Sequence, residues 1–295
     1  MDFISQMLLM GTGGDQSDSF LAVAHPNSPY ISIYERDVDT FTKLNDPSTL
    51  PIGTGFDVAF SADGTYLAVA HRFVPYLTIY KRSEGVFTKL TNPSTLPTSD
   101  GYGVAFSADG TYLAVAHNVS PYLTIYERDV DTFAKLNGPS TVPTGIGQGV
   151  AFSADGTYLA VSHFVSPYLT IYERDGSTFT KLNDPSTLPT GTGYGVAFSA
   201  DGTYLAVAHE VSPYLTIYKL NVGTFTKLTV SPPPSVSNSV AFSADGTYLA
   251  VAHEVSPYLT IYERNGDTFT KADDPSTLPT GTGYGVAFSA DGTYL

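Results

Sequence analysis

Six histidines at nearly equal intervals constrain this 295-residue sequence more than any other feature. Successive histidines are separated by 46, 46, 46, 46 and 44 residues. Each one ends the string Leu-Ala-Val-Ala-His or a close variant of it. A fixed period of roughly 40–50 residues is typical of repeat architectures, in which each repeat is one supersecondary unit. Nearly everything after residue 20 therefore consists of six copies of one unit.

Each unit predicts four β-strands and no helix. Four short segments rich in β-branched and aromatic residues follow one another, separated by turns that contain Gly, Pro, Asp or Ser. The Asp-Gly pair between two of them, as at Asp63 and Gly64, suits a tight hairpin. A unit of four antiparallel strands repeated at this period is typical of a propeller blade. The sequence predicts an all-β, six-bladed β-propeller built from four-stranded antiparallel blades.

The two ends of the sequence predict how the ring closes. The repeats begin inside a unit at residues 20–25 and stop inside one at residues 291–295. We expect residues 286–289 to supply the innermost strand of the first blade, so that the N- and C-terminal segments pair. The propeller would then span residues 20–295, and residues 1–19 would form an N-terminal arm.

Composition narrows the classes of partner. The chain has 28 acidic and 14 basic residues, a formal charge of −14 and no run of Lys or Arg. Such a charge repels phosphate backbones and anionic lipids, so we expect neither nucleic-acid binding nor membrane insertion. No basic leader and no apolar run near 18 residues is found, so we expect no signal peptide and no membrane span; the compartment stays open. The absence of Cys excludes a disulfide framework, a thiol nucleophile and a Cys-based zinc site.

The repeated string also carries a family resemblance. Val-Ala-Phe-Ser-Ala-Asp-Gly-Thr-Tyr-Leu-Ala-Val-Ala-His, followed by Leu-Thr-Ile-Tyr-Glu-Arg, resembles the first three strands of a WD-repeat blade over about residues 20–295. The Trp-Asp pair of that family is replaced here by Tyr-Glu or Tyr-Lys, and its Gly-His pair is missing. The resemblance therefore implies the propeller fold without the polar network of that family. The near-identical units also resemble propellers of phage and prophage tail-associated proteins.

The histidines are the most visible candidate site, and geometry argues against a metal there. Zinc ligands lie about 2 Å from the ion, whereas equivalent residues of neighbouring blades are roughly 10 Å or more apart. We therefore expect the histidines to be structural, each bonding a neighbouring loop or Tyr. The Asp-Gly hairpins lack the several oxygen ligands that calcium requires, so we expect no metal and no cofactor. The six predicted structural residues are His25, His71, His117, His163, His209 and His253.

Repetition argues against catalysis, because acid/base work needs unlike groups around one substrate. Positions that differ between copies are more informative. One set follows each histidine and a second precedes the first strand of each unit. In the topology that the resemblance implies, both sets lie on one face, and the second set borders the central channel. They are Pro26, Arg72, Asn118, Phe164, Glu210 and Glu254 in the first set, and Phe56, Tyr102, Gln148, Tyr194, Asn238 and Tyr284 in the second.

Two interpretations of this variation stay open, neutral change in exposed loops and a binding surface. We predict a non-catalytic scaffold that binds a protein or glycan partner through this rim. A lectin with several equivalent sugar sites is one alternative. A lactonase-type hydrolase is the second alternative.

Overall fold

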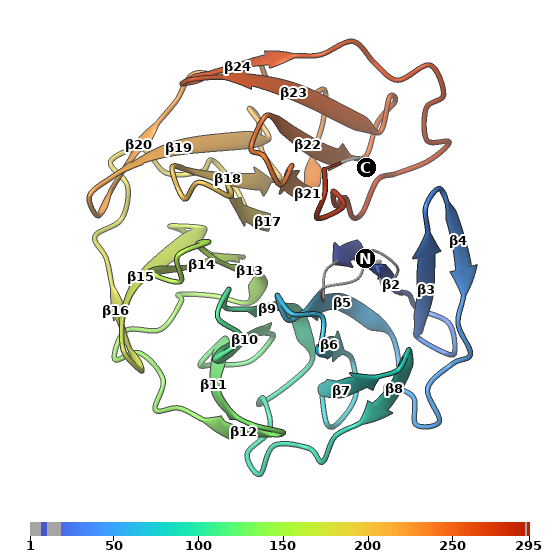
Figure 1. Cartoon of the computed structure of the whole chain (residues 1–295). Helices are drawn as coiled ribbons and strands as arrows, with labels where there is room; N and C mark the ends of the chain where they lie inside the picture. Colours follow the sequence, from blue (N-terminus) through green and yellow to red (C-terminus); the bar gives the residue numbers. More distant parts are fainter. Residues whose placement is uncertain (1–6, 11–18, 293) are drawn as a thin grey trace.

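The computed structural model describes residues 7–10, 19–292 and 294–295, and all regular structure in them is β-strand. The strands form six four-stranded antiparallel sheets arranged around a central axis (Figure 1). In every blade the strands follow chain order from the axis outward, and we call them A, B, C and D. The prediction of a six-bladed β-propeller is confirmed. No helix in these residues is long enough and apolar enough to cross a membrane.

The strand bounds repeat from blade to blade. Blades 1 to 3 contain β1 (Met7–Met10), β2 (Ser19–Ala24), β3 (Ile31–Asp37), β4 (Thr40–Lys43), β5 (Gly55–Phe60), β6 (Tyr66–His71), β7 (Leu77–Ser83), β8 (Val86–Lys89), β9 (Gly101–Phe106), β10 (Tyr112–His117), β11 (Leu123–Asp129) and β12 (Thr132–Lys135). Blades 4 to 6 contain β13 (Gly147–Phe152), β14 (Tyr158–His163), β15 (Leu169–Asp175), β16 (Thr178–Lys181), β17 (Gly193–Phe198), β18 (Tyr204–His209), β19 (Leu215–Asn221), β20 (Thr224–Lys227), β21 (Ser237–Phe242), β22 (Tyr248–His253), β23 (Leu259–Asn265) and β24 (Thr268–Lys271).

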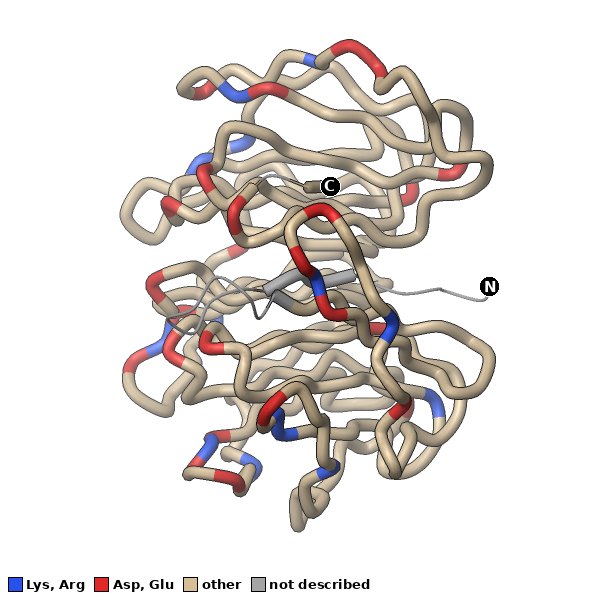
Figure 2. The backbone as a smooth tube through the Cα atoms, turned by 45° about the vertical axis from the view of Figure 1, so that its right-hand side comes forward, with Lys and Arg blue, Asp and Glu red and all other residues tan. Residues whose placement is uncertain are grey.

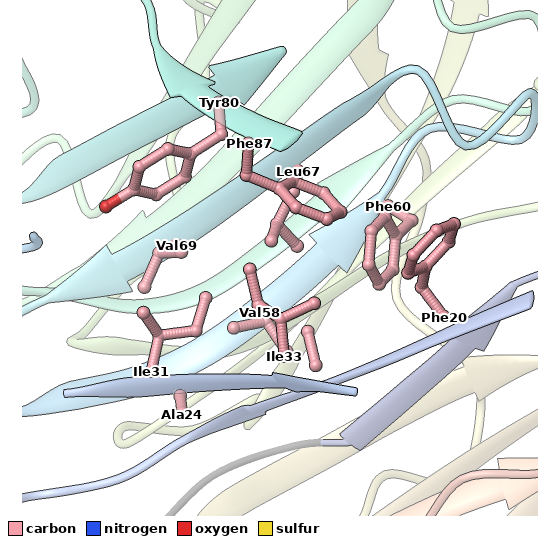
Figure 3. Close-up of a cluster of buried hydrophobic side chains, with 11 residues drawn as sticks. Phe20, Ala24, Ile31, Ile33, Val58, Phe60, Leu67, Val69, Tyr80 and Phe87 are labelled. Carbon is pink, nitrogen blue, oxygen red and sulfur yellow. The ribbon is translucent and has the colours of Figure 1, made fainter. Parts of the chain in front are cut away.

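Apolar side chains between adjacent blades form the core. Between blades 1 and 2, Phe20, Ile33 and Val58 pack with Leu67 and Tyr80 in one buried cluster (Figure 3). The final Tyr of each Leu-Thr-Ile-Tyr segment is fully buried in blades 2 to 6. Aliphatic and aromatic burial of this extent supplies most of the driving force for folding. Each blade is therefore stabilised by its neighbours in the ring.

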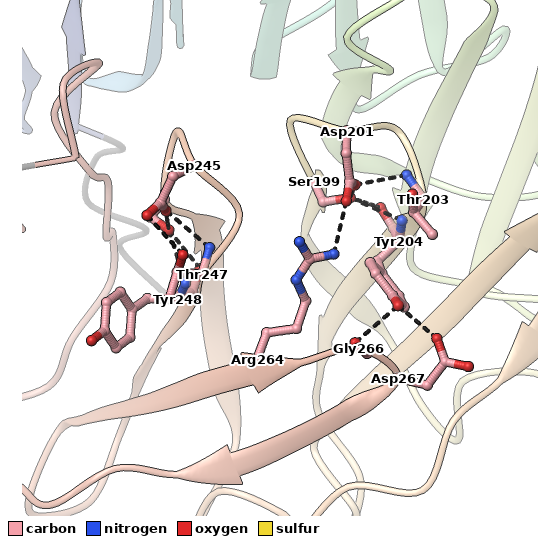
Figure 4. A network of polar contacts seen from close by, with 11 residues as sticks. Ser199, Asp201, Thr203, Tyr204, Asp245, Thr247, Tyr248, Arg264, Gly266 and Asp267 are labelled. Atoms are coloured by element: carbon pink, nitrogen blue, oxygen red, sulfur yellow. Dashed lines mark hydrogen bonds and ion pairs between the residues drawn. The ribbon is translucent and has the colours of Figure 1, made fainter.

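Polar side chains join the A–B hairpin of one blade to strand C and the C–D turn of the next blade along the chain. The A–B hairpin of blade 5 reaches strand C and the C–D turn of blade 6: Asp201 pairs with Arg264 at 2.8 Å, and the Tyr204 hydroxyl donates to Asp267 at 2.6 Å (Figure 4). Tyr66 of blade 2 donates in the same way to Asp131 of blade 3, at 2.7 Å. In both cases the hairpin contacts the blade that follows it.

The ring closes differently from the prediction. The expected innermost strand of blade 1, residues 286–289, does not pair with β2, because β1 pairs with β2 instead. Within the predicted arm, Met7–Met10 forms β1, the innermost strand of blade 1. Residues 1–6 and 11–18 of the arm lie outside the described residues.

The C-terminal segment instead stands where a further blade would begin. Asp291 pairs with Arg36 of blade 1 at 2.8 Å, and Tyr294 bonds Asp39 in the C–D turn of blade 1. The hairpin of blade 5 makes the same two contacts with blade 6. The segment therefore precedes blade 1 in the ring, and we call the place of residues 285–295, between blade 6 and blade 1, the seventh position (Figure 1).

Charged residues lie mainly in the turns at the two faces and on the outer strands (Figure 2). Strands A and B of the described residues contain one Asp, Glu, Lys or Arg, which is Asp57 in β5. Strands A and B are thus uncharged in the described residues except at this Asp and, when protonated, at the histidines that end strand B.

Candidate functional site

Backbone hydrogen bonds bring the two variable sets together on one face of the ring. The residue after each buried histidine bonds the loop that leads into strand A of the same blade. Arg72 N–H donates to the Thr54 carbonyl at 3.0 Å, and Glu210 N–H donates to the Thr192 carbonyl at 3.0 Å. In blades 2 to 6 these bonds hold the first variable set and the loop that carries the second set on the same face of the ring, at one mouth of the central channel. The C–D turns lie at the other face, against the A–B hairpins.

Below this mouth, a cavity of about 270 Å³ lies inside the channel. Its wall is made by the Val-Ala-Phe stretch of strand A in blades 2 to 6, together with Val286 and Ala287 from the seventh position. None of the rim residues lines this cavity, so the apolar interior of the channel and the polar rim are separate features.

The histidines lie beneath the rim and make a repeated structural bond. In five blades the ring is fully buried, and Nε2 is bonded to the Thr hydroxyl seven residues later, as for His71 and Thr78 at 2.9 Å. His25 has Ser32 as its counterpart, at 3.1 Å. The shared partner is thus a strand C hydroxyl, which we did not expect. The expected loop bond is also present in two blades, from His71 Nδ1 to the Ile52 carbonyl at 3.1 Å and between His117 Nδ1 and the Thr98 hydroxyl at 3.3 Å. Burial lowers the pKa to about 4 in His71, His117, His163 and His209.

On one side of the mouth the side chains are aromatic and basic. Phe56 and Tyr102 make an edge-on ring contact with centroids 4.9 Å apart. Arg72 is the one basic side chain in the two variable sets, and its charge acts on both Asp100 and Tyr102. This side therefore offers a cation beside a flat aromatic surface.

Another part of the mouth, formed by blades 5 and 6, is acidic. Tyr194 is buried there, whereas Glu210 and Glu254 are exposed. Burial raises the pKa of the Tyr194 phenol to about 12, and the negative charges of Glu210 and Glu254 add to the rise. The phenol is thus a proton donor at neutral pH, with two carboxylates near it. Beside them the Asn238 side-chain amide donates to the Gly283 carbonyl at 3.0 Å.

Sequence reasoning missed Asp57. Its carboxylate is buried and accepts N–H bonds from Val58 at 2.7 Å and from Val104, in the next blade, at 2.8 Å. Burial raises its pKa to about 8, against the opposing effect of these two bonds. The signal was present, because blades 3, 4 and 5 carry Gly at this position and blade 6 carries Ser.

The mouth is therefore asymmetric, which corrects the expectation of equal environments. A cationic aromatic side and an acidic phenolic side face the same opening. No group of three or more His, Asp or Glu side chains able to hold a metal ion occurs in the described part of the chain. The functional groups present can activate water with a carboxylate and donate a hydrogen bond from a phenol.

Comparison with known proteins bears on the predicted activity. The model of the family "Lactonase, 7-bladed beta-propeller" matches residues 150–288, which include Tyr194, Glu210 and Glu254. No curated protein matches the chain.

Solved structures share the fold at low identity. A proposed 6-phosphogluconolactonase from Bacteroides uniformis is 16% identical with a TM-score of 0.71, covering 90% of this chain and 83% of that chain. The periplasmic gluconolactonase of Pseudomonas aeruginosa is 17% identical with a TM-score of 0.62, covering 90% and 82%. A chain of the Mitotic Checkpoint Complex is 17% identical with a TM-score of 0.73, covering 99% and 86%.

These matches contradict the prediction of a non-catalytic scaffold and favour the second alternative, a hydrolase. Repetition misled the prediction because strand sequences repeat while the rim residues that could carry chemistry do not. The propeller part of the WD-repeat resemblance is confirmed, and the resemblance to phage-tail proteins finds no support.

Proposed function

We propose that this protein is a lactonase-type hydrolase whose reaction takes place at the acidic side of the channel mouth. The observation that carries the proposal is the group of Tyr194, Glu210 and Glu254, which come from two different positions of the repeat and lie near one another within the matched residues 150–288. A carboxylate and a neutral phenol are the base and the hydrogen-bond donor that ester hydrolysis requires.

In the proposed reaction, Glu210 or Glu254 accepts a proton from water as the water oxygen attacks the lactone carbonyl carbon. The Tyr194 hydroxyl donates a hydrogen bond to the carbonyl oxygen while negative charge develops on it. The bond between that carbon and the ring oxygen then breaks, and the ring oxygen takes the proton back from the glutamic acid. The product is an open-chain hydroxy acid, which releases one proton to solvent at neutral pH.

The charge of the site favours an uncharged sugar lactone. Two carboxylates and a chain charge of −14 disfavour a phosphorylated substrate near the reacting carbon. We therefore expect hydrolysis of gluconolactone to exceed that of its 6-phosphate.

The test is titration of the released acid, corrected for spontaneous lactone opening. Glu210→Gln and Glu254→Gln are compared singly and together, because general-base catalysis contributes roughly a hundredfold or more. We expect the double variant to lose at least that factor in kcat. Glu263→Gln, an exposed glutamate at the opposite face, is the matched control and keeps full activity. Full activity in the double variant, or no lactonase activity in the wild type, contradicts the proposal.

A further inference from the structure

We infer that the outer edge of the ring carries a binding site for a small sugar acid, between blade 3 and blade 4. The near-identical units provide an internal control, because each residue of this site can be compared with its counterparts in the other blades. Blade 3 lacks an acidic or amide side chain that most of the other blades carry. The inference is independent of the proposed function, since none of the residues involved belongs to the rim.

A cavity of about 390 Å³ lies between the loop that follows β12 and the outermost strand of blade 4, β16, at the outer edge of the ring (Figure 1). No Asp or Glu lines this cavity, although the chain has 28 acidic and only 14 basic residues. The lining can therefore accept an anion and can donate hydrogen bonds to it. The polar residues that line it carry hydroxyl or amide groups, and they are Asn137, Ser140, Ser177, Thr178 and Thr180.

Gly138, which also lines the cavity, is the residue at which blade 3 departs from the repeat. Its backbone does not require glycine, because its φ lies outside the left-handed region and a Cβ built on it would have no atom within 4 Å. The missing side chain is therefore not a demand of the fold, and it leaves open space in the lining. The counterparts of Gly138 in four other blades are Asp46, Asn92, Asp184 and Asp274.

The glycine leaves Lys135, three residues earlier in the chain, without the partner that its counterparts have. In blade 4 the Lys181 ammonium lies 2.5 Å from the Asp184 carboxylate and donates to the carbonyl of Leu182, the next residue, at 3.2 Å. Among the described residues the Lys135 ammonium forms no ion pair and no hydrogen bond. The same contact with the side chain three residues later occurs in Lys43–Asp46, Lys89–Asn92 and Lys271–Asp274.

Comparison between blades places the Lys135 ammonium beside the cavity. The two groups that Lys181 contacts belong to residues equivalent to Gly138 and Leu136, and both of these line the cavity. A cation without a partner, next to a hollow lined by uncharged donors, favours an anion that completes a charge-assisted hydrogen bond.

The repeat itself indicates the chemistry of the ligand. In three blades the group beside this lysine is a carboxylate, so a ligand carboxylate would take the place of the missing Asp. The hydroxyl and amide groups of the lining can then bond further hydroxyls of the same ligand. A small carboxylic acid that carries several hydroxyls, a sugar acid, matches both parts of the site.

The test is equilibrium dialysis of the full chain against radiolabelled gluconate, which combines one carboxylate with several hydroxyls. We expect one gluconate bound per chain. Gly138→Asp should weaken binding roughly tenfold or more, because the new carboxylate occupies the place of the ligand beside Lys135. Lys135→Gln should weaken it as much by removing the charge. Lys181→Gln is the matched control and should bind like the wild type, because Asp184 already pairs with that ammonium.

Competition experiments identify the class of ligand. Unlabelled gluconate should displace the label, whereas glucose, which lacks the carboxylate, and acetate, which lacks the hydroxyls, should each need roughly ten times the concentration or more. Displacement by acetate or inorganic phosphate as effective as by gluconate would define a general anion site. Equally effective displacement by glucose would define a sugar site without the lysine contact. Either result overturns the assignment to a sugar acid.

Three results would overturn the site itself: no saturable binding, unchanged binding in Gly138→Asp, or equal losses in Lys135→Gln and Lys181→Gln. The melting temperature of each variant, measured by circular dichroism, shows whether its fold is intact. Lactonase activity is not a readout in this test, so this inference and the proposed function fail separately.

Discussion

Asp57 is the residue at which this ring departs most from its own repeat. In blades 3 and 4 the equivalent residue is Gly, and a Cβ at Gly103 would lie 2.7 Å from the carbonyl oxygen of Gln148 in the next blade. Asp57 instead reaches the next blade with its carboxylate, which accepts a hydrogen bond from Val104 N–H. A buried carboxylate tethers two blades at this point and destabilises the fold whenever it is charged.

The raised pKa of Asp57 predicts a pH effect of defined sign. The unfolded chain releases this proton near pH 4 and the folded chain near pH 8, so the stabilising contribution is present below about 4 and is lost as pH rises to about 8. One proton corresponds to about 1.4 kcal/mol per pH unit. Asp57→Gly, the residue of blades 3 to 5, should remove this decline, as measured by urea unfolding across that range. Parallel pH profiles for the two proteins would contradict the prediction.

A second prediction concerns the Tyr that ends strand C. Tyr126 is fully buried and its hydroxyl donates to the Thr95 carbonyl at 3.0 Å, whereas Tyr34 of blade 1 is half-buried beside the seventh position. Tyr126→Ala should cost about 3–5 kcal/mol in unfolding free energy, as for other buried aromatics. Tyr34→Ala should cost less than half as much. Similar losses in the two variants would mean that the seventh position is already covered.

For individual residues, the sequence predicted which positions vary but not which of their side chains lie close together. Glu210, Glu254 and Tyr194 were all recognised as rim residues, yet their proximity depends on how two neighbouring blades are set around the channel. Asp57 was overlooked because a charged residue in a strand signals a functional site only when its burial is known. Burial is a property of the assembled ring.

Strands were the most predictable elements. The alternation in Leu-Ala-Val-Ala-His and the Asp-Gly hairpin define strand B and its connection to strand A, and β6 and β10 occupy those residues. The sequence did not reveal the irregular register near the start of strand A, for example between Gly147 and Gly149. Such bulges depend on the path of the loop that enters the strand.

Strand B provides a comparison of elements with identical sequence. β10 and β22 both read Tyr-Leu-Ala-Val-Ala-His, but Tyr112 in β10 is buried and Tyr248 in β22 is not. Amide exchange depends on local opening, which requires less energy where fewer apolar contacts are lost. We predict faster exchange in β22 than in β10.

Mass spectrometry distinguishes the two strands when each fragment extends one residue beyond the histidine. That residue is Asn118 for β10 and Glu254 for β22. The intrinsic exchange rates of the shared residues are equal, so any difference reports position in the ring. Equal protection of the two strands would contradict the prediction.

For the whole molecule, the number of repeats predicted the number of complete blades but not the number of places in the ring. Six copies suggested a six-fold closure through paired ends, whereas β1 forms the inner strand of blade 1 and leaves the C-terminal segment at a further place. The number of places depends on the twist of each blade and on how closely adjacent blades pack. Neither quantity can be obtained from the period of the repeat.

The buried histidines predict the acid stability of the whole ring. Their pKa is near 6.5 in an unfolded chain and about 4 in the folded protein for His71, His117, His163 and His209. Depressed values mean that their contribution is complete above about pH 6.5 and is lost as pH falls to about 4. Each should contribute up to about 1.4 kcal/mol per pH unit to the slope of unfolding free energy. Urea titrations that show equal stability at both ends of this range would refute this prediction.

The contacts between the hairpin of one blade and strand C of the next have a consequence for how the repeat could multiply by gene duplication. Blades 2 to 6 carry the hairpin Asp and Tyr that suit a successor, and all blades except the fifth carry the strand C Arg that suits a predecessor. A duplication of one whole unit would therefore insert a blade that fits both neighbours from the first generation, with no point mutation needed at either interface. Leu220, in place of Arg in the fifth blade, is a mark by which descendants of that unit would be recognised.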